Sequence, residues 1–252
     1  KPSVFYKGGT QVELQPARDA AKFWDTKYYK RDFDLARRLG LNVFRISIEW
    51  ARIEPEKDNW DQVAIDNYKE MIVAMREKNL IPIVSLNHAT LPLWVMTPPQ
   101  EFLRRTGQNL LPHPLKDLPL ADPPPSDPYW KSLRGWENHE TVERFIRYVE
   151  RIIVEFRDLV DYWITIGEPV ATIIGGGYIS GLWPPGFFLK GKKARIVLHN
   201  LIEAHVQAYN KITALDNIDA DGDGFTNKVG FTHLMMDVIP AEQSKIFGIT
   251  TK

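Results

Sequence analysis

Trp163-Ile164-Thr165-Ile166-Gly167-Glu168-Pro169 is a short apolar stretch that ends in one carboxylate followed by a proline. Its β-branched and aromatic residues predict a buried β-strand. Such a strand delivers the acid to the rim of a sheet, which is where barrel enzymes hold their catalytic residues. Glu168 is therefore the first candidate for a catalytic acid.

The chain on both sides of this strand alternates between helical and strand patterns. Helical periodicity predicts helices at 25–38, 62–78, 138–158 and 194–215, and apolar strands follow them at 41–48, 80–86, 160–166 and 228–234. This alternation is typical of parallel strands joined by crossover helices. The predicted fold class is therefore α/β.

The number of predicted units is smaller than the length suggests. A complete barrel of eight strand–helix units takes about 250 residues, and this chain has 252. Residues 89–137 contain ten prolines and little periodicity, so we expect a long Pro-rich loop over the C-terminal face of the sheet. We expect residues 1–252 to form a single but partial barrel domain, with about half of the strands evident.

Composition excludes several classes of function. The 32 basic residues balance the 32 acidic ones, so no net field attracts nucleic acid or an anionic membrane. No apolar stretch approaches the roughly 20 residues that span a bilayer, and residues 1–10 lack the apolar core of a signal peptide. We expect a soluble protein, which favours the cytoplasm without deciding the compartment. The absence of cysteine excludes disulfides and cysteine metal sites.

Four stretches carry a resemblance to a known family. They are GLNVFRISIEWARIEP at 40–55, LNHATLPLW at 86–94, TIGEP at 165–169 and GYISGLWPPG at 177–186. In this order they resemble the second strand, the end of the third strand, the acid/base motif and the following loop of glycoside hydrolase family 1, the retaining β-glycosidases. The match at 86–94 is closer to archaeal members. The resemblance covers about residues 24–240 and implies a (β/α)8 TIM barrel of which strands two to five are evident.

The resemblance implies a role for individual residues. It makes Glu168 the general acid/base, Arg45 the residue that orients the nucleophile's carboxylate, and His88 a hydrogen-bonding partner of the sugar. Two positions depart from the family's pattern. Gly167 stands where the family usually has an asparagine that contacts the sugar's 2-hydroxyl, and Ala89 stands where it usually has a tryptophan.

The second carboxylate of a retaining glycosidase is not identified. The family's first strand has no convincing counterpart before Trp24, and its late strand with the nucleophilic glutamate would lie beyond Lys252. Retaining hydrolysis needs two carboxyl groups about 5–5.5 Å apart. We therefore expect the 252-residue chain by itself to hydrolyse aryl β-glycosides very slowly or not at all.

Each of these residues also has a purely structural explanation. A glutamate before proline can be a solvated loop residue, and Arg45 with Glu49 can form an ion pair inside the barrel. His88 can be a buried histidine bonded to a backbone carbonyl. Three tryptophans offer indole faces on which a sugar stacks, although large aromatics also pack cores; they are Trp94, Trp163 and Trp183, and we select only Trp183, in the Pro-Pro-Gly loop.

A separate acidic stretch resembles half of a calcium loop. Asp219, Asp221 and Asp223, followed by Gly224, reproduce the first half of the EF-hand pattern. Position twelve is Gly230 instead of a glutamate, and a strand is predicted where a helix should follow. The loop is a weak calcium candidate, and a solvated acidic turn is the alternative. No other cofactor is predicted.

Three functions remain open on these grounds. The first is hydrolysis of the β-O-glycosidic bond of a small-molecule glycoside or oligosaccharide, as in a β-glucosidase or β-galactosidase. The second is an inactive sugar-binding relative, which Gly167 and Ala89 favour. The third is a half-barrel that associates with itself or with a complementary fragment, because an open parallel sheet leaves two strand edges unpaired. Nucleic acid and membranes are not expected as partners.

Overall fold

The computed structural model of this protein describes residues 4–7, 10–13, 20–96, 132–235, 245–246 and 249–250. Its helices are η1 (Ala20–Trp24), α1 (Thr26–Arg38), α2 (Trp50–Ile53), α3 (Gln62–Glu77), η4 (Gly135–Glu137), α5 (Glu140–Phe156), η5 (Pro169–Ile179) and α6 (Gly191–Leu215). Its strands are β1 (Val4–Lys7), β2 (Thr10–Glu13), β3 (Val43–Ser47), β4 (Ile81–Ser85), β5 (Tyr162–Gly167), β6 (Lys228–Thr232), β7 (Lys245–Ile246) and β8 (Ile249–Thr250).

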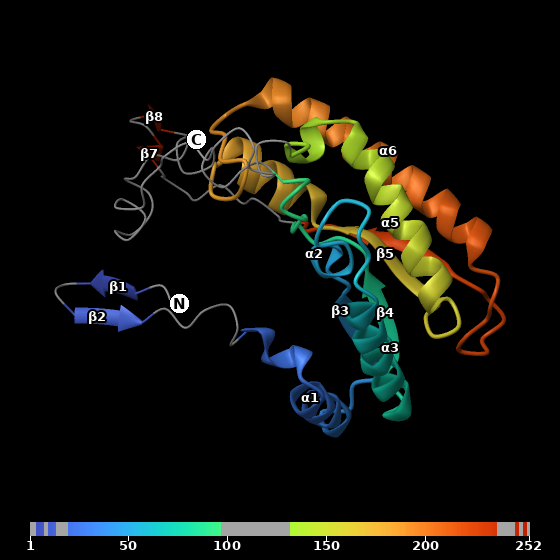
Figure 1. Ribbon diagram of the computed structural model, residues 1–252. Helices are drawn as coiled ribbons and strands as arrows, with labels where there is room; N and C mark the ends of the chain where they lie inside the picture. The colour runs from blue at the N-terminus through green and yellow to red at the C-terminus, as the bar shows by residue number, and fades with distance from the viewer. Residues whose placement is uncertain are drawn as a thin grey trace.

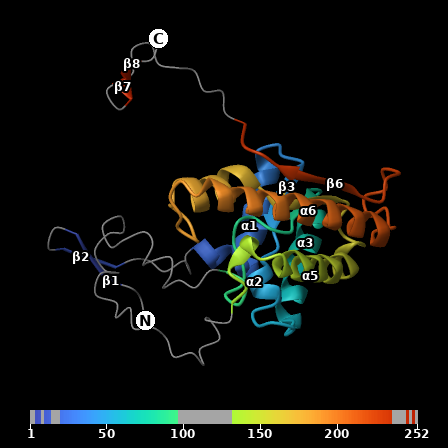
Figure 2. The same ribbon diagram turned by 90° about the horizontal axis from the view of Figure 1, so that it is seen from above.

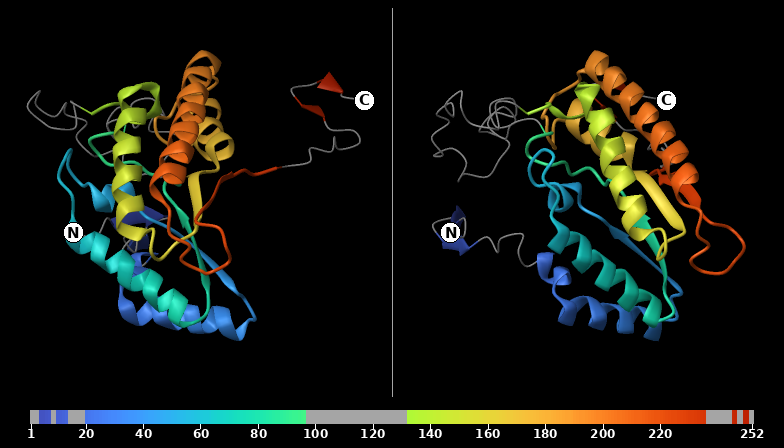
Figure 3. Two further views of the ribbon diagram at one scale, coloured as in Figure 1. Left: turned by 90° about the vertical axis from the view of Figure 1, so that its right-hand side faces the viewer. Right: turned by 45° about the vertical axis from the view of Figure 1, so that its right-hand side comes forward.

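The central feature is a four-stranded parallel sheet with the order β3-β4-β5-β6. Each strand pairs with the next one along the chain, and a helix connects every consecutive pair. The helices form a row over the sheet, with α1 and α6 at its two ends (Figures 1 and 3). Figure 2 shows α5 and α6 side by side. The four helices and four strands expected from the sequence are present, with ends shifted by a few residues.

Helix α1 illustrates how the sequence sets an element. The Asp25 carboxylate caps its start by accepting a hydrogen bond from the Lys27 N–H at 2.8 Å. Tyr29, Phe33 and Ala36 recur on one face and are buried. The chain leaves the helix through Gly40 at φ +80°, a left-handed conformation that glycine adopts without strain. An amphipathic stripe between two caps therefore fixes this helix against the sheet.

The core lies between the helices and the covered face of the sheet. Residues at alternate positions of the strands point into it, among them Ile46, Val84 and Trp163. Trp50 joins β3 to α5, because its ring stacks on Tyr148 with centroids 5.4 Å apart. Trp50 also begins α2, a single helical turn that periodicity does not predict because four residues are too few to show a pattern.

The segment that follows β5 is a π-helix, η5, and the sequence predicts no helix or strand there. Three consecutive glycines, at 175–177, disfavour a helix by propensity alone. At Gly176 the absence of a side chain lets Trp183 pack on the helix, because a Cβ there would lie 1.8 Å from Cδ1 of Trp183. The glycines thus allow the following loop to pack directly against the backbone of the π-helix.

Several expectations fall on other parts of the chain. Most of the Pro-rich loop expected at 89–137 lies outside the described residues, and its described ends contain only the short helix η4. β1 with β2 and β7 with β8 form two separate antiparallel pairs that were not predicted. Within the described ranges, no helix has the length and apolar character needed to cross a bilayer.

Both outer strands of the parallel sheet border exposed apolar side chains. Beside β6, α6 carries an outward stripe at helical spacing and the chain continues with further exposed apolar residues; these are Leu198, Ile202, Val206 and Tyr209, then Phe231, Leu234 and Met235. Beside β3, the exposed residues are Leu35, Leu39, Leu41 and Val43. Stripes of this kind normally pack against a neighbouring element.

Candidate active site

Glu168 lies directly after β5, at the C-terminal edge of the sheet. Its backbone is left-handed, with φ 52° and ψ 46°, which is uncommon for a residue with a side chain. Its N–H donates to the Thr232 carbonyl at 3.0 Å, and its own carbonyl accepts from the Thr172 N–H at 2.9 Å. Two neighbouring segments therefore hold a strained residue in place, which is a common arrangement at functional sites.

The carboxyl group of Glu168 is half-buried. Its Oε2 is inaccessible to solvent and has no hydrogen-bond partner among the described residues. Buried polar atoms without partners are rare in folded proteins and often mark a functional position. Beside it, the pairing of β5 with β6 shifts by one residue between Ile164 and Gly167. A β-bulge of this kind changes the direction in which the strand end points.

His88 follows β4 and lies against the end of β5. The Gly167 N–H donates to the Asn87 carbonyl at 2.7 Å, which joins the two strand ends. A Cβ on Gly167 would lie 2.6 Å from His88 Nδ1 and 3.0 Å from Cγ. The imidazole thus occupies the space that a side chain at position 167 would need. The structure places His88 against Gly167, the residue before Glu168, where any side chain larger than glycine would displace the imidazole.

A hydrogen-bonded turn supports His88, and the sequence did not single out its members Asn87 and Thr90. Asn87 donates through Nδ2 to the Thr90 carbonyl at 2.8 Å, and Ala89 between them is left-handed at φ 68°. The Thr90 hydroxyl donates to Oε2 of Glu49 at 2.5 Å. Short polar side chains that bond nearby backbone are a recognisable turn signal, and Asn87 carries it.

The contacts of Glu49 connect secondary-structure elements to one another. Its N–H donates to the hydroxyl of Tyr68 at 3.1 Å, and burial raises the pKa of Tyr68 to about 12. Together with the Thr90 hydroxyl, this contact fixes the end of β3 to α3 and to the turn after β4. The alternative in which Glu49 pairs with Arg45 is not seen, because no ion pair joins them.

Arg45 is on β3, two strands away from Glu168. Its neighbours Phe44 and Ile46 pack towards the helices, so Arg45 faces the opposite side of the sheet and is exposed. In register it pairs with Ile83 of β4. It forms no hydrogen bond or ion pair with any residue in the described part of the chain. Its role in orienting a carboxylate therefore stays a prediction.

The three tryptophans considered as sugar platforms differ in position. Trp163 is buried and donates through Nε1 to Asp216 at 2.8 Å. Trp94 is half-buried, donates to the Glu54 carbonyl at 3.0 Å and packs edge-on against Trp50. Trp183 is 57% exposed and lies over Gly176. Trp183 is the most exposed of the three, and its stacking role stays a prediction.

A cavity of about 350 Å³ lies next to these strand ends. Its walls come from the turn after β4, from η4, from η5 and from the Trp183 loop. Ala89 and Thr172, which lie close to His88 and Glu168 in the chain, are both in its lining. Ligand pockets are usually concave and mostly apolar, with a few polar groups.

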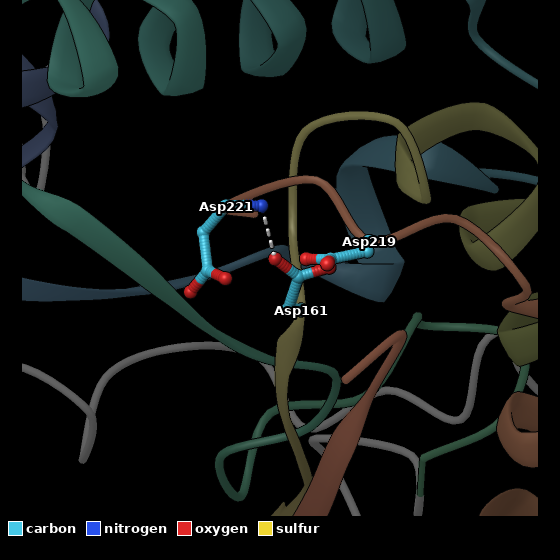
Figure 4. A group of neighbouring side chains, drawn as sticks. All are labelled: Asp161, Asp219 and Asp221. Atoms are coloured by element: carbon cyan, nitrogen blue, oxygen red, sulfur yellow. Dashed lines mark hydrogen bonds between the residues drawn. The ribbon is translucent and has the colours of Figure 1, made fainter. Parts of the chain in front are cut away.

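The acidic loop lies at the other end of β5. Oxygens of Asp161, Asp219 and Asp221 lie within 4.8 Å of one another (Figure 4). Asp161 accepts hydrogen bonds from the N–H groups of Ala220 and Asp221, and burial raises its pKa. Asp223 instead binds Lys228 at 2.5 Å. The expected set of three carboxylates is therefore changed, and calcium binding by the loop stays a prediction.

Comparison with known proteins gives one family. Residues 7–105 and 130–247 match the family described as Glycosyl hydrolase family 1. A beta-galactosidase of Pyrococcus woesei is 31% identical over 228 residues, which cover 77% of this chain and 40% of that protein. A beta-galactosidase of Saccharolobus solfataricus is 28% identical, with 74% and 39% covered. The chain thus spans about two fifths of the length of these relatives.

Solved structures similar to this chain include a member of the same family. A crystal structure from Fervidobacterium pennivoraus superimposes with a TM-score of 0.64 and 27% identity, over 84% of this chain and 42% of that chain. The family 1 b-glucosidase from Thermotoga maritima superimposes with a TM-score of 0.59 and 26% identity, over 84% and 37%. The expected fold class is confirmed: the parallel sheet and its helices are an incomplete (β/α)8 barrel.

Proposed function

Because this chain belongs to glycosyl hydrolase family 1, we propose that it carries the acid/base side of a retaining β-glycosidase. The substrate class is a β-O-linked glucoside or galactoside, or a short oligosaccharide. The names of the relatives include both beta-galactosidase and b-glucosidase, so they do not select one sugar. The observation that carries the proposal is Glu168 at a strand end, held in a left-handed backbone with His88 beside it.

The proposed reaction uses two steps. In the first, Glu168 donates its proton to the glycosidic oxygen, the bond to the leaving group breaks, and a second carboxylate attacks the anomeric carbon. In the second, Glu168 removes a proton from water, which displaces the sugar from that carboxylate. The resemblance puts the attacking carboxylate beyond Lys252 and gives Arg45 the task of orienting it. His88 would hydrogen-bond a sugar hydroxyl next to the acid.

Hydrolysis of 4-nitrophenyl β-glucoside tests this assignment. We expect the 252-residue chain alone to release nitrophenolate very slowly, because retaining hydrolysis needs two carboxyl groups and only Glu168 is assigned here. Glu168→Gln keeps the shape of the side chain but has no proton to donate, so the remaining release should be lost. Release that Glu168→Gln leaves unchanged contradicts the role of Glu168. A turnover comparable to that of a full-length relative contradicts the expectation of slow release.

A sugar-binding protein without catalysis is the first alternative. It is favoured by the position of His88, whose ring fills the place in front of Glu168 where the family usually has asparagine. The missing contact to the 2-hydroxyl strengthens in the transition state of the reaction, so its loss reduces the rate more than the binding. Glucose or galactose binding without any turnover in a longer form of the protein would favour this alternative.

Association with a second chain is the other alternative, and the exposed apolar residues along both outer strands favour it. Strands β3 and β6 each have one neighbour among the described strands, and unpaired edges readily recruit another strand. We propose that these edges are covered either by a second copy or by a complementary fragment. Neither nucleic acid nor a membrane is proposed as a partner, given the balanced charge.

A further inference from the structure

Thr232 ends β6 and lies next to the strand end that carries the candidate acid. In the parallel pairing of β5 with β6, Thr232 is the partner of Gly167. Its carbonyl accepts the hydrogen bond that the Glu168 N–H donates at 3.0 Å. The backbone of Thr232 is therefore fixed to the backbone of the acid, although the two residues are far apart in the sequence.

The direction of the Thr232 side chain follows from its neighbours. Phe231 packs edge-on against His205 of α6, with ring centroids 5.2 Å apart. Successive residues of a strand project to opposite faces, so Thr232 projects to the face that α6 does not cover. Paired residues of neighbouring strands share a face, so Thr232 and position 167 project to the same side.

The His88 ring lies on this same side, because it occupies the place of a Cβ on Gly167. The row across the strand ends therefore consists of an imidazole after β4, a glycine that ends β5, and a threonine hydroxyl that ends β6. Glu168 directly follows this glycine. Its left-handed backbone, at φ 52°, takes it out of the regular alternation of the strand.

Thr232 and Glu168 each bury a polar atom that lacks a partner. Oγ1 of Thr232 and Oε2 of Glu168 are both inaccessible to solvent, and neither has a hydrogen-bond partner among the residues that the structure describes. Leaving a buried polar atom unpaired costs free energy, so such atoms are rare in folded proteins. The two atoms are chemically complementary, because a hydroxyl donates and a carboxylate oxygen accepts.

We propose that Thr232 is a positioning residue for the acid, and that its hydroxyl hydrogen-bonds Oε2 of Glu168. The inference rests on the proposed function of Glu168 and adds to it the side chain that holds the carboxyl group. The contact forms through rotation about side-chain bonds, while the backbone hydrogen bond keeps the two residues in place.

A hydroxyl is suited to this task because of the two steps of the reaction. Glu168 acts as an acid in the first step and as a base in the second, so its carboxyl group alternates between the protonated and the ionised form. A threonine hydroxyl accepts a hydrogen bond from the protonated form and donates one to the ionised form. Thr232 can therefore hold the same carboxyl oxygen through both steps.

A double-mutant cycle on the complete 252-residue chain tests the contact without requiring turnover. The variants are Thr232→Val, which replaces the hydroxyl by a methyl group, Glu168→Ala, and the two combined. Urea unfolding at neutral pH gives the midpoint of each. We expect Thr232→Val to lower the midpoint by at least about 0.3 M when Glu168 is present. It should not lower the midpoint in the Glu168→Ala protein, where the hydroxyl has no partner to lose.

Two further variants identify the cause of this shift. Thr232→Ser keeps the hydroxyl and should keep the dependence on Glu168. Thr213→Val makes the same substitution at an exposed position of α6, and its effect should be equal with and without Glu168. Equal midpoint shifts for Thr232→Val in the two backgrounds would overturn the proposal.

The leaving group of the substrate distinguishes positioning of the acid from a general loss of structure. With azide as the attacking anion, cleavage of phenyl β-glucoside needs the proton of Glu168, whereas 2,4-dinitrophenolate departs without one. We expect Thr232→Val to slow the first reaction about tenfold, the equivalent of one hydrogen bond, and the second less than about twofold. Thr232→Ser should restore the first. An equal loss with both substrates would contradict a positioning role.

The outcomes separate this inference from the proposed function. Coupling between Thr232 and Glu168, in a protein whose cleavage of phenyl β-glucoside is unchanged by Glu168→Gln, supports the contact and rejects Glu168 as the acid. Cleavage that Glu168→Gln abolishes, in a protein without coupling, supports the acid and rejects the role of Thr232. If azide produces no cleavage, the double-mutant cycle alone decides whether the contact exists.

Discussion

The contact between His88 and Gly167 connects the two strand ends that carry the candidate site. The imidazole can lie there only because position 167 has no side chain. The ring packs on Gly167, the residue before the acid, and the Gly167 N–H also donates to the carbonyl of Asn87, the residue before His88. An asparagine at position 167, as is usual in the family, is not compatible with this position of the His88 ring.

Gly167→Ala should therefore act on the site more than on the fold. The new Cβ would lie 2.6 Å from His88 Nδ1, so the imidazole ring must move from its present position. We expect phenyl 1-thio-β-glucoside affinity to fall by at least about fivefold, and the free energy of unfolding to fall by about 1–2 kcal/mol from overpacking. Calorimetry and urea unfolding measure the two effects.

Gly191→Ala is the control for this variant. Gly191 is exposed at the start of α6, and an added Cβ there would meet nothing within 4 Å. It should leave ligand affinity unchanged and not lower stability. Equal ligand affinities in Gly167→Ala and the unmodified chain would show that the His88 position does not matter for binding.

The sequence predicts the position of a residue when that residue belongs to a local motif, and fails to do so when its contacts are distant in sequence. Glu168, His88 and Trp183 stand in motifs that are local in sequence, so their places at the strand ends and in the following loop could be anticipated. Asn87 and Thr90 act through contacts to segments that are distant in sequence or through turn geometry. The cavity depends on four separate segments, so no single motif predicts it.

Helices and strands, too, are predicted from the sequence when their pattern is local and missed when they depend on distant contacts. The long amphipathic helices can be predicted because their periodicity extends over more than ten residues, and the strands because each is a short apolar run that follows a helix. η5 was missed because three glycines argue against a helix, whereas tertiary packing of the Trp183 loop favours it. The bulge between β5 and β6 was missed because register depends on both partners and one sequence shows only one strand at a time.

The junction of α6 and β5 contains a buried carboxyl group that makes stability depend on pH. Burial raises the pKa of Asp216 to about 6, against the opposing hydrogen bond from Trp163. In the unfolded chain this pKa is about 4. Between these two values the folded protein holds a proton that the unfolded chain has released. The contribution of Asp216 to stability is therefore fully present below about pH 4 and is lost as the pH rises through about 6.

Asp216→Asn should remove this dependence. Its amide oxygen can still accept the Trp163 hydrogen bond, and it does not ionise. Relative to the unmodified chain, the variant should become more stable by about 2 kcal/mol between about pH 4 and about pH 7. Urea unfolding at the two pH values measures this change, with Asp158→Asn at an exposed position as the control. A difference between Asp216→Asn and the unmodified chain that does not change with pH would refute the assignment.

At the scale of the molecule, the row of helices over a parallel sheet whose outer strands each have one neighbour among the described strands defines a partial barrel. The apolar stripe on α6 belongs to a helix that contacts β6, and exposed apolar residues also lie in and after β6, where Phe231 is 54% exposed and Met235 is 87% exposed. Large exposed apolar patches often mark sites of protein–protein interaction. The sequence predicted an incomplete sheet from the count of units, but the stripe could be assigned to the surface only once the packed face of α6 was known.

We expect the 252-residue chain to self-associate through this surface in solution. Ile202→Lys combined with Val206→Lys places two charges on the stripe and should shift sedimentation towards the monomer. Val63→Lys combined with Val154→Lys alters two exposed positions on α3 and α5 and should leave the association unchanged. A monomeric protein with one cooperative melting transition would argue against assembly through these edges.

The most direct measurement of the central claim, that Glu168 donates the proton while another anion must attack, is chemical replacement of that anion. Sodium azide is added to the 252-residue chain with 4-nitrophenyl β-glucoside. Azide attacks the anomeric carbon opposite the leaving group to give the α-glucosyl azide, and the departing oxygen takes the proton of Glu168. We expect azide to accelerate the release of 4-nitrophenol, and Glu168→Gln to reduce the accelerated rate by at least about a hundredfold. Equal acceleration of both proteins by azide would contradict the claim.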